Sequence, residues 1–447
     1  MASLPLEGIR VLDFGVAVAG PFCTRMLAYM GAEVIKAESL TRLDIGRGLM
    51  FPDHKLPKRF WDDNGVYNTQ NYNKLGLGIN LTKPKGLELF AELVKKCDVV
   101  VTNFTTKVVR RFGLDYETLR KVKPDIILLT SSGFGHTGPW AEYASIGTSL
   151  EPMCGHPSLT GYVDGPPLQG PGAYPDMPGA LNGAIAILAA LEYRRRTGKG
   201  QWIDLAQYQT GVCTIGEAVL DYIANGRVQD RMGNRHPHMA PHGVYRCAGN
   251  DNWVAIAVAN DEEWRALCAA MGQPALAEDE RFHDSLSRLE HQDELDQIIE
   301  EWTKPQDHYA VMHLLQGVGV AAGAVLNMKE YMTDPQLRAR NHFPAVRDIS
   351  EEVGVRLCLG PWFQLSETPG GIRTTAPKLG QHNTEILTSI LGLSPADVEQ
   401  LQQDGVIGTE PLEVDQSLFA MAPLPVMKQL GAIEDFDADY KQILGIE

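Results

Sequence analysis

The stretch that decides the fold is GIRVLDFGVAVAGPFCTRMLAYMGAEVIKAE, residues 8–38. Apolar residues run together over 8–15, recur with helical spacing over 20–31, and run together again over 32–38. This order predicts a strand, a helix and a second strand, which is one β-α-β unit. Because the first strand ends in glycine, we expect a turn lined by backbone to lead into the helix.

The same alternation continues to about residue 135. The expected elements are helices over 85–97 and 116–123 and strands over 98–104 and 125–135. Strands that alternate with helices predict an α/β fold, a Rossmann-like, doubly wound parallel sheet. Ligands bind such sheets beyond the carboxyl ends of the strands. We therefore expect one rim to be lined by the loops after Phe14, Glu38, Asn103 and Ser132.

Length and composition predict more than one domain. The chain has 447 residues, of which 44% are hydrophobic, so two or three domains are expected. A Gly/Pro-rich loop over 155–176 precedes an expected long helix over 177–196, and a polar stretch near 225–243 separates this part from a new strand-helix unit. We predict a large first part over 1–225, a smaller α/β domain over 226–330, and a return to the large domain over 331–447 with a C-terminal extension from 409.

Charge and cysteine content restrict the partners and the compartment. The formal net charge is −16, from 40 basic and 56 acidic residues, which argues against nucleic acid as a partner. No apolar run is long enough to cross a bilayer, and the first residues lack the pattern of a signal peptide, so no membrane association is expected. Seven cysteines without a C-x-x-C pair favour a reducing, cytoplasmic location.

Several common sites are disfavoured by motif. The chain lacks G-x-S-x-G, H-E-x-x-H and the P-loop pattern. In the first loop Gly15 and Gly20 do not form G-x-G-x-x-G, so a dinucleotide site is disfavoured although Glu38 stands where a ribose-binding acid would. The histidines of NRHPHMAPHG lie in a loop broken by prolines, without carboxylate or cysteine partners, so we expect no metal site there. We expect them to hydrogen-bond a loop or a ligand.

Basic and amide side chains gather on the expected rim. Each by itself is more often a solvated surface residue, but their shared position at strand ends favours an anionic, phosphate-bearing ligand. They are Arg42, Arg47, Asn73, Lys74, Asn103, Arg110 and Arg111.

Asp176 lies between two prolines and directly before the long helix, in PGAYPDMPGALNGA. This position is typical of an N-cap, with Pro178 in the first turn. A helix N-terminus also stabilises an ionised carboxylate, and the small residues that follow leave room beside it for an activated acyl group. The residues alone therefore leave a cap and a reactive nucleophile both open.

Taken together, seven motifs resemble one family. They are LEGIRVLDFGVAVAGPFCTRMLAYMGAEVIKAE, NYNKLGLGINLTKPKG, DVVVTNF, SSGFGHTGPW, ALEYRRRTGKGQWIDLA, GNRHPHMAPHGVY and APKLGQHNTEIL. In order and over residues 6 to about 407, they resemble the class III CoA-transferases, the group of formyl-CoA transferase and the carnitine CoA-transferases. Each motif is weak alone, and their common register makes the resemblance specific.

The resemblance implies a reaction and its nucleophile. Asp176 occupies the place of the family's catalytic aspartate and would attack a donor acyl-CoA, such as succinyl-CoA, to give an acyl-aspartyl anhydride and then an aspartyl-CoA thioester. An acceptor carboxylic acid would then take the CoA. Coenzyme A is a substrate in this scheme, and no permanently bound cofactor or metal is implied.

The resemblance also implies CoA contacts on the rim. The matching positions are Val16, Ala17, Val18, Arg47, Asn73, Lys74, Asn103, Phe104 and Arg111, with His136 beside them. Two departures matter. Val16 and Val18 replace polar residues of formyl-CoA transferase, which disfavours an oxalate-like substrate. His136 replaces a glutamine, and it either contacts the acyl group or packs in its turn.

Two other functions stay open at this point. The family includes α-methylacyl-CoA racemases, but Ile146 stands where these carry a catalytic histidine and cannot transfer a proton. A non-catalytic CoA-binding subunit of a heteromeric transferase is the other alternative, which the presence of Asp176 disfavours. The family fold implies an interlocked homodimer, or a heterodimer with a homologous subunit, with the site between the large domain of one chain and the small domain of the other.

The segment over 48–70 is longer and more aromatic than its family counterpart. It is either a surface loop or a cover on the acceptor pocket. As a cover, Phe60, Trp61 and Tyr67 would suit an aromatic acid, with Lys58 and Arg59 near a second carboxylate, as in succinyl-CoA:benzylsuccinate CoA-transferases.

Overall fold

A six-stranded parallel sheet forms the centre of the first part of the chain. The computed structural model describes residues 4–170, 172–347, 354–414 and 422–446. The strand order is β3-β2-β1-β4-β5-β6, with β1 and β4 paired at the centre. This order is that of a doubly wound dinucleotide-binding sheet, so the predicted α/β fold is confirmed. The strands are β1 (Arg10–Asp13), β2 (Glu33–Ser39), β3 (Lys74–Ile79), β4 (Val99–Thr102), β5 (Ile127–Ser132) and β6 (Trp202–Ala206).

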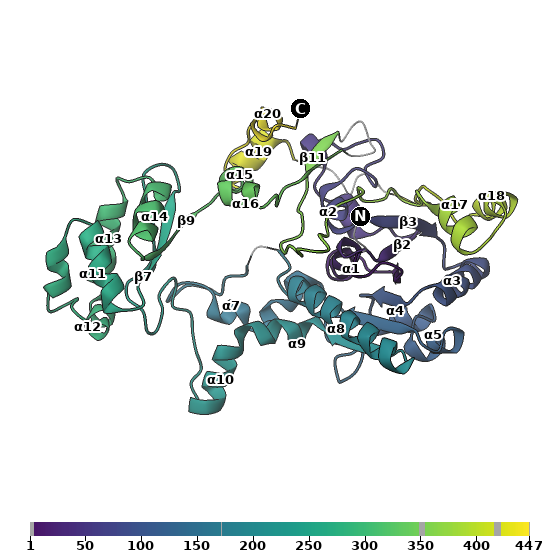
Figure 1. Ribbon diagram of the computed structural model, residues 1–447, viewed down its shortest axis with the longest axis horizontal. Coiled ribbons are helices and arrows are strands. Elements are labelled where there is room, and N and C mark those ends of the chain that lie inside the picture. Colours follow the sequence, from purple (N-terminus) through teal and green to yellow (C-terminus); the bar gives the residue numbers. More distant parts are fainter. Residues whose placement is uncertain (1–3, 171, 348–353, 415–421, 447) are drawn as a thin grey trace. The chain divides into compact units, whose positions relative to one another are not determined.

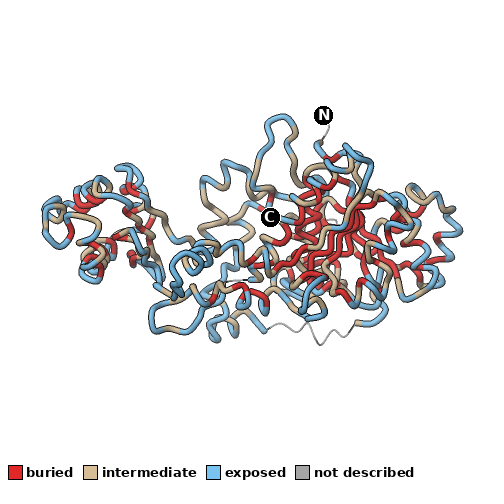
Figure 2. The backbone as a smooth tube through the Cα atoms, turned by 90° about the horizontal axis from the view of Figure 1, so that it is seen from below, coloured by how far each residue is buried: buried red, intermediate tan, exposed pale blue. Residues whose placement is uncertain are grey.

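Helices cover both faces of this sheet (Figure 1). Consecutive strand residues alternate between two hydrophobic clusters: Val11 packs with α1 (Ala19–Tyr29) and α8 (Asp176–Thr197), and Leu12 packs with α3 (Pro84–Lys96) on the other face. Figure 2 shows these strands as the buried centre of this part. Strands buried on both faces explain why the sequence shows apolar runs here without polar alternation.

Strand β3 has no counterpart in the sequence prediction. It reads KLGLGI, and glycine is depleted in strands. Its glycines are required by close packing, because a Cβ on Gly78 would collide with the carbonyl oxygen of Gly408, and one on Gly76 would lie 2.7 Å from that of Lys378. The returning C-terminal part of the chain therefore covers this edge strand.

The chain divides into two compact units. The first combines residues 1–155, 170–216 and 336–447, and the second combines 156–169 and 217–335. The second unit contains an antiparallel sheet of order β7-β8-β9 and its own core around the fully buried Trp264. Its strands and main helices are β7 (His242–Arg246), β8 (Trp253–Ala257), β9 (Ala321–Val325), α11 (Asp261–Ala270), α12 (Ser285–Glu290), α13 (Gln292–Thr303) and α14 (His308–Gly317).

The remaining elements are short. They are η1 (Ile45–Gly48), η2 (Pro52–His54), α2 (Gly65–Gln70), α4 (Thr106–Arg111), α5 (Tyr116–Val122), α6 (Gly147–Leu150), η3 (Pro152–Cys154), α7 (His156–Leu159), α9 (Gln207–Val212), η4 (Cys213–Ile215), α10 (Gly216–Asn225), η5 (Pro274–Glu278), α15 (Met328–Thr333), α16 (Pro335–Ala339), β10 (Ala345–Arg347), β11 (Val355–Leu357), α17 (Asn383–Glu385), η6 (Ile386–Ile390), α18 (Pro395–Gln403), α19 (Leu424–Gln429) and α20 (Tyr440–Leu444).

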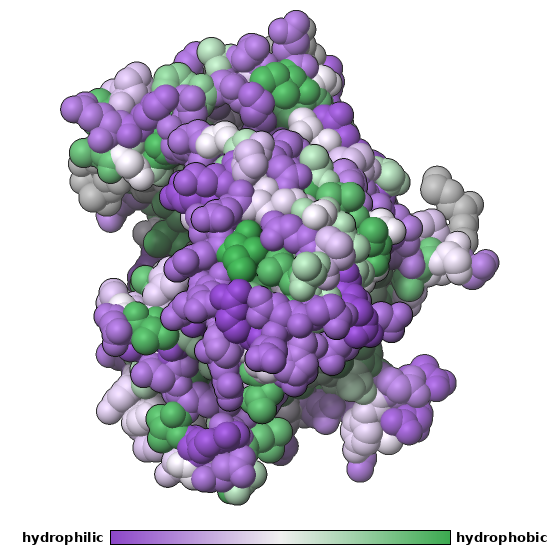
Figure 3. Space-filling view, turned by 90° about the vertical axis from the view of Figure 1, so that its left-hand side faces the viewer, coloured by the Kyte–Doolittle hydropathy of each residue, from purple (hydrophilic) through white to green (hydrophobic). Residues whose placement is uncertain are grey.

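The residues on one face of the molecule differ in hydropathy (Figure 3). On the face drawn in Figure 3, hydrophilic residues predominate and hydrophobic ones lie among them. Among the residues that the structure describes, no helix combines the length and the apolar character needed to cross a bilayer.

Candidate active site

The loop after β1 is shaped by close packing and by one amide side chain. Asn103, after β4, accepts a hydrogen bond from the backbone N–H of Val16 at 2.8 Å and donates one to the carbonyl oxygen of Val16 at 2.8 Å. A Cβ on Gly15 would lie 2.7 Å from the carbonyl carbon of Gly20. These glycines therefore allow the loop to pack against itself before α1 begins, with Val18 as an N-cap that makes no side-chain cap bond.

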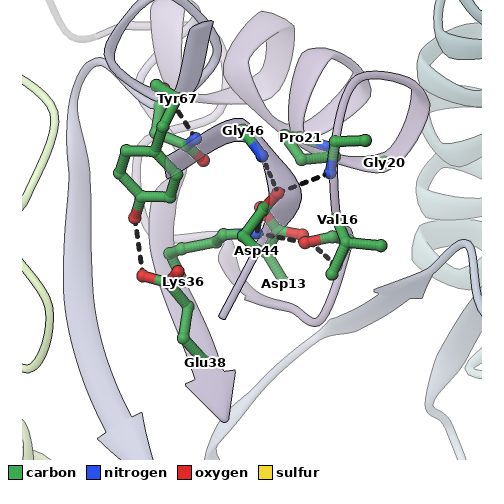
Figure 4. Close-up of polar contacts among 12 residues, drawn as sticks. Asp13, Val16, Gly20, Pro21, Lys36, Glu38, Asp44, Gly46 and Tyr67 are labelled. Atoms are coloured by element: carbon green, nitrogen blue, oxygen red, sulfur yellow. Dashed lines mark hydrogen bonds and ion pairs between the residues drawn. The ribbon is translucent and has the colours of Figure 1, made fainter. Parts of the chain in front are cut away.

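Asp44 joins this loop to the segment after β2, as Figure 4 shows. Its Oδ1 accepts hydrogen bonds from the backbone N–H groups of Ala17 (2.8 Å) and Gly46 (2.9 Å), and its Oδ2 lies 3.3 Å from the Lys36 ammonium. Ala17 has a φ of 58°, so this carboxylate holds a left-handed residue in place. Sequence reasoning missed Asp44; its position before the short IGRG turn was the available signal.

Arg47 lies below the rim and does not reach solvent. Its guanidinium makes two hydrogen bonds to Glu38, at 2.8 and 2.6 Å, lies 3.5 Å from Asp62, and sits 3.5 Å from the ring centroid of Tyr67. Although burial favours the neutral acid, the Arg47 charge holds the pKa of Glu38 below its ordinary value. Arg47 is thus fully engaged inside the protein in this conformation.

Lys74 and Asn73, like Arg47, contact other groups of the protein. The Lys74 ammonium is buried and lies 2.9 Å from the Asp13 carboxylate. Burial lowers the pKa of Lys74 to about 8, and Asp13 opposes this while Lys36 adds to it. The Asn73 side chain accepts hydrogen bonds from the backbone of the returning segment, including that of Thr374 at 2.9 Å. These predicted contact residues therefore support the rim from within.

His136 fastens two rim loops to each other. Its backbone N–H donates to Asp204 at 2.8 Å, and its Nε2 lies 3.2 Å from the carbonyl oxygen of Phe104. Burial lowers the pKa of His136, which favours the neutral ring. The ring thus lies against the loop that carries Phe104, and its contact with an acyl group stays a prediction. The sequence analysis did not single out Asp204, which lies near the carboxyl end of β6.

Arg111 differs from Arg47 and Lys74 in that it is exposed, at the end of α4.

Asp176 is the first residue of α8. Pro175 takes the N-cap position without a side-chain cap bond, so the expectation that Asp176 caps the helix was wrong. A Cβ on Gly147 would lie 2.7 Å from Oδ2 of Asp176, so the carboxylate sits directly against the glycine backbone. Burial raises the pKa of Asp176 to about 6. Its helix precedes β6 in a parallel sheet, which places its N-terminus at the carboxyl edge with the other rim loops.

Glu151 is a second buried carboxylate near this position that sequence reasoning missed. Its backbone N–H bonds to the carbonyl oxygen of Gly147 at 3.0 Å, one turn away. Its Oε1 accepts from the Gly170 N–H at 2.8 Å, and its Oε2 has no hydrogen-bond partner among the described residues. No residue pattern around Glu151 distinguished it from an ordinary surface glutamate.

Of the aromatic residues in 48–70, Phe51 lines a pocket, whereas Phe60, Trp61 and Tyr67 are not in its lining. Phe60 and Tyr67 are fully buried, and Trp61 is partly buried. Arg59 pairs with Glu410 at 2.7 Å. Burial of Phe60 and Tyr67 stabilises the segment itself and disfavours these two rings as an acceptor surface, and the acceptor pocket stays a prediction.

The histidines at 236 and 238 lie in a loop of the second unit, and His242 is the first residue of β7. His242 Nδ1 lies 2.7 Å from the carbonyl oxygen of Asn234, and His236 Nδ1 accepts from the backbone N–H of His238 at 3.1 Å. These rings thus hydrogen-bond their own loop. No group of three or more His, Cys, Asp or Glu side chains suited to a metal occurs in the described ranges.

Comparisons with known proteins agree on one family. Residues 6–383 match the model of CoA-transferase family III. The chain is 36% identical to succinyl-CoA–D-citramalate CoA-transferase of Chloroflexus aurantiacus, over 90% of this chain and 98% of that protein. It is 31% identical to the succinyl-CoA–L-malate CoA-transferase beta subunit of the same organism, over 91% and 98%. A CAIB/BAIF family protein from Brucella suis shares its structure, with a TM-score of 0.77, 31% identity, and coverage of 87% and 100%.

Proposed function

The chain belongs to CoA-transferase family III and is an enzyme, and from this premise we propose that it moves CoA from succinyl-CoA to a carboxylic acid through Asp176. One observation carries the assignment of Asp176. Its carboxylate lies directly against the backbone of Gly147 at the start of α8, where burial raises its pKa to about 6. A carboxylate that is poorly solvated but ionised near neutral pH suits nucleophilic attack.

Each proposed step forms one bond to a carbonyl carbon and breaks another. A carboxylate oxygen of Asp176 attacks the thioester carbonyl, the C–S bond breaks, and CoA leaves as a thiolate. The thiolate attacks the aspartyl carbonyl of the anhydride and releases succinate, which leaves an aspartyl-CoA thioester. The acceptor carboxylate attacks the aspartyl carbonyl of this thioester, the C–S bond breaks, and CoA leaves as a thiolate while a second anhydride forms. The thiolate attacks the acceptor's carbonyl of that anhydride, the C–O bond to the aspartyl oxygen breaks, and Asp176 is released as a carboxylate. We propose that this cycle uses no metal and no redox cofactor.

The residues around Asp176 support this chemistry. Gly147 has no side chain where the carboxylate lies, so the Asp176 carboxylate and the methyl group of Ala173 can both approach its backbone. Asn103 and Asp44 hold the backbone of the first loop, which keeps its geometry fixed without further reorganisation. Arg111 is exposed and available to a phosphate, whereas Arg47 and Lys74 position the rim from below.

For the acceptor, we propose a small aliphatic dicarboxylic acid. Two similar enzymes are named for D-citramalate and L-malate, which are both of this class. The burial of Phe60 and Tyr67 supports an aliphatic rather than an aromatic acid. An acceptor screen with succinyl-CoA tests this proposal, and a clear preference for an aromatic acid would reject it.

The first experiment traps the intermediate. Wild type, Asp176→Asn and Asp125→Asn are incubated with succinyl-CoA without acceptor, treated with hydroxylamine, and analysed by intact mass and peptide mapping. We expect a hydroxamate at residue 176 in the wild type and in Asp125→Asn, whose aspartate is 41% exposed away from the site. Asp176→Asn should remain unmodified. Equal labelling of all three proteins, or of none, would reject Asp176 as the nucleophile.

We propose that two chains assemble, either as a homodimer or with a homologous second subunit. The similarity to a protein named as a beta subunit supports the second form. Light scattering on the purified chain separates these two forms, because a particle of one 49.1 kDa chain with activity restored by a second subunit would reject the homodimer.

We also propose a cytoplasmic location. The seven free cysteines support a reducing compartment, and cell fractionation tests this.

A further inference from the structure

The segment over 50–54 contains three left-handed residues. Met50 has a φ of 58°, and Asp53 and His54 each have a φ of 53°. None of them is glycine, so each adopts a conformation that its Cβ disfavours. Such a backbone persists only where surrounding contacts hold it in place.

Those contacts come from the far end of the chain. The Asp53 carboxylate accepts a hydrogen bond from the Tyr440 hydroxyl and another from the Lys441 ammonium at 2.9 Å. Both partners belong to α20, within the described residues 422–446, which we call the C-terminal segment. Two adjacent side chains of one helix thus converge on one strained residue.

Two further contacts complete this attachment. The Nε2 of His54 lies 2.6 Å from the carbonyl oxygen of Ala422, at the start of the C-terminal segment. Arg356 of β11 lies 3.4 Å from Asp53. The Asp53 and Lys441 side chains are 27% and 38% exposed, so water and salt reach this ion pair and weaken it.

The strained segment is connected to the active-site rim. The N–H of Gly65 bonds to the carbonyl oxygen of Met50 at 2.5 Å, which closes the segment on itself. On its amino side, Asp44 holds the backbone N–H groups of Gly46 and Ala17. Asp44 thus connects the start of the 44–64 segment to the first loop, and the buried Arg47, paired with Glu38 and Asp62, lies between Asp44 and the strained residues.

We infer that the C-terminal segment is a detachable intramolecular clamp, which docks α20 on Asp53 and thereby restricts the 44–64 segment and the first loop. Because the contacts are polar and partly exposed, the clamp opens without unfolding of the sheet. Its opening frees the strained residues and loosens the loop that Asp44 holds. This inference does not depend on the reaction proposed above.

Hydrogen-exchange mass spectrometry tests the clamp directly in the full chain. The variants are Asp53→Asn, which keeps a residue type that tolerates a left-handed φ, and the double variant Tyr440→Phe/Lys441→Ala. The control is Glu192→Gln, which removes an exposed ion pair on α8. We expect exchange to rise about tenfold in the C-terminal segment, over 44–66 and at Ala17 in both clamp variants, with β1 and β5 unchanged.

The inference fails if exchange rises only over 422–446, because the C-terminal segment would then be attached without restraining anything. It also fails if both clamp variants behave like Glu192→Gln. Should Asp53→Asn lose protection throughout the sheet, the double variant decides, since it changes no residue of the 50–54 segment.

Discussion

Among single residues, the partners of a buried charged group indicate whether it has a structural role or a chemical one. Arg47 has Glu38 and Asp62, and Lys74 has Asp13, so both cations are neutralised where they lie. A buried charge with such partners is a structural element whose removal leaves an unpaired ion. The raised pKa of Asp176 has burial as its cause and no cation to offset it, which is the pattern of a functional carboxylate.

The rate of adduct formation should follow the ionisation of Asp176. Only the carboxylate is nucleophilic, so we expect the single-turnover rate with succinyl-CoA to rise tenfold per pH unit below about 6 and to level off above it. Because this folded-state pKa is raised, Asp176 costs no stability below its unfolded pKa near 4 and opposes folding as pH rises towards 6. Rapid-quench measurements between pH 4.5 and 8 check this, and a flat profile would contradict it.

At the scale of elements, the glycines of the rim are placed by packing. Gly15 and Gly20 let the first loop fold against itself, and Gly147 lets Asp176 approach the backbone. The two glycines of β3 serve the returning chain in the same way. At each of these positions glycine allows another segment to pack closely against the backbone. This packing explains the glycines of the first loop without a dinucleotide-binding motif.

Replacement of Gly15 by alanine should disturb the first loop. The new Cβ would lie 2.7 Å from the Gly20 backbone, closer than real Cβ contacts come, so the loop must shift. We expect a loss of about 1–3 kcal/mol in the free energy of unfolding and a raised KM for succinyl-CoA. Gly216→Ala is the matched control, because a Cβ added at Gly216 would meet nothing within 4 Å. Denaturant unfolding and initial rates measure both effects, and equal behaviour of the two variants would refute the packing argument.

At the scale of the whole molecule, the two units have separate cores. The sheet of the first unit is covered by two clusters on its two faces, and the second unit packs its own cluster around Trp264, Phe282 and Leu295. Each unit therefore buries a hydrophobic core of its own.

Trp264→Ala should weaken the second unit selectively. Trp264 is fully buried, and its truncation leaves a cavity that costs about 3–5 kcal/mol. We expect hydrogen exchange to accelerate in β7, β8 and β9 while β1, β4 and β5 keep their protection. Parallel loss of protection in both sheets would show that the two units unfold as one.

Much of the large domain was predictable because its strands are buried on both faces. Adjacent apolar residues at 11–12 and 99–101 and the helical spacing of 19–29 signal a parallel sheet without any knowledge of neighbours. Strand β3 escaped this reasoning, since its glycines are set by the backbone of residues 378 and 408, which the local sequence cannot reveal.

The sequence by itself determined the alternation of strands and helices, the placement of rim residues at strand ends, and the position of Asp176 before a long helix. The tertiary structure was needed to show which polar side chains of the rim are already paired with other protein groups. Arg47, Lys74 and Asn73 read as ligand contacts along the chain, but residues up to 330 positions away neutralise or hydrogen-bond them. The reason is physical: burial and partner distance set the state of a charge, and both depend on contacts between segments that are remote in sequence.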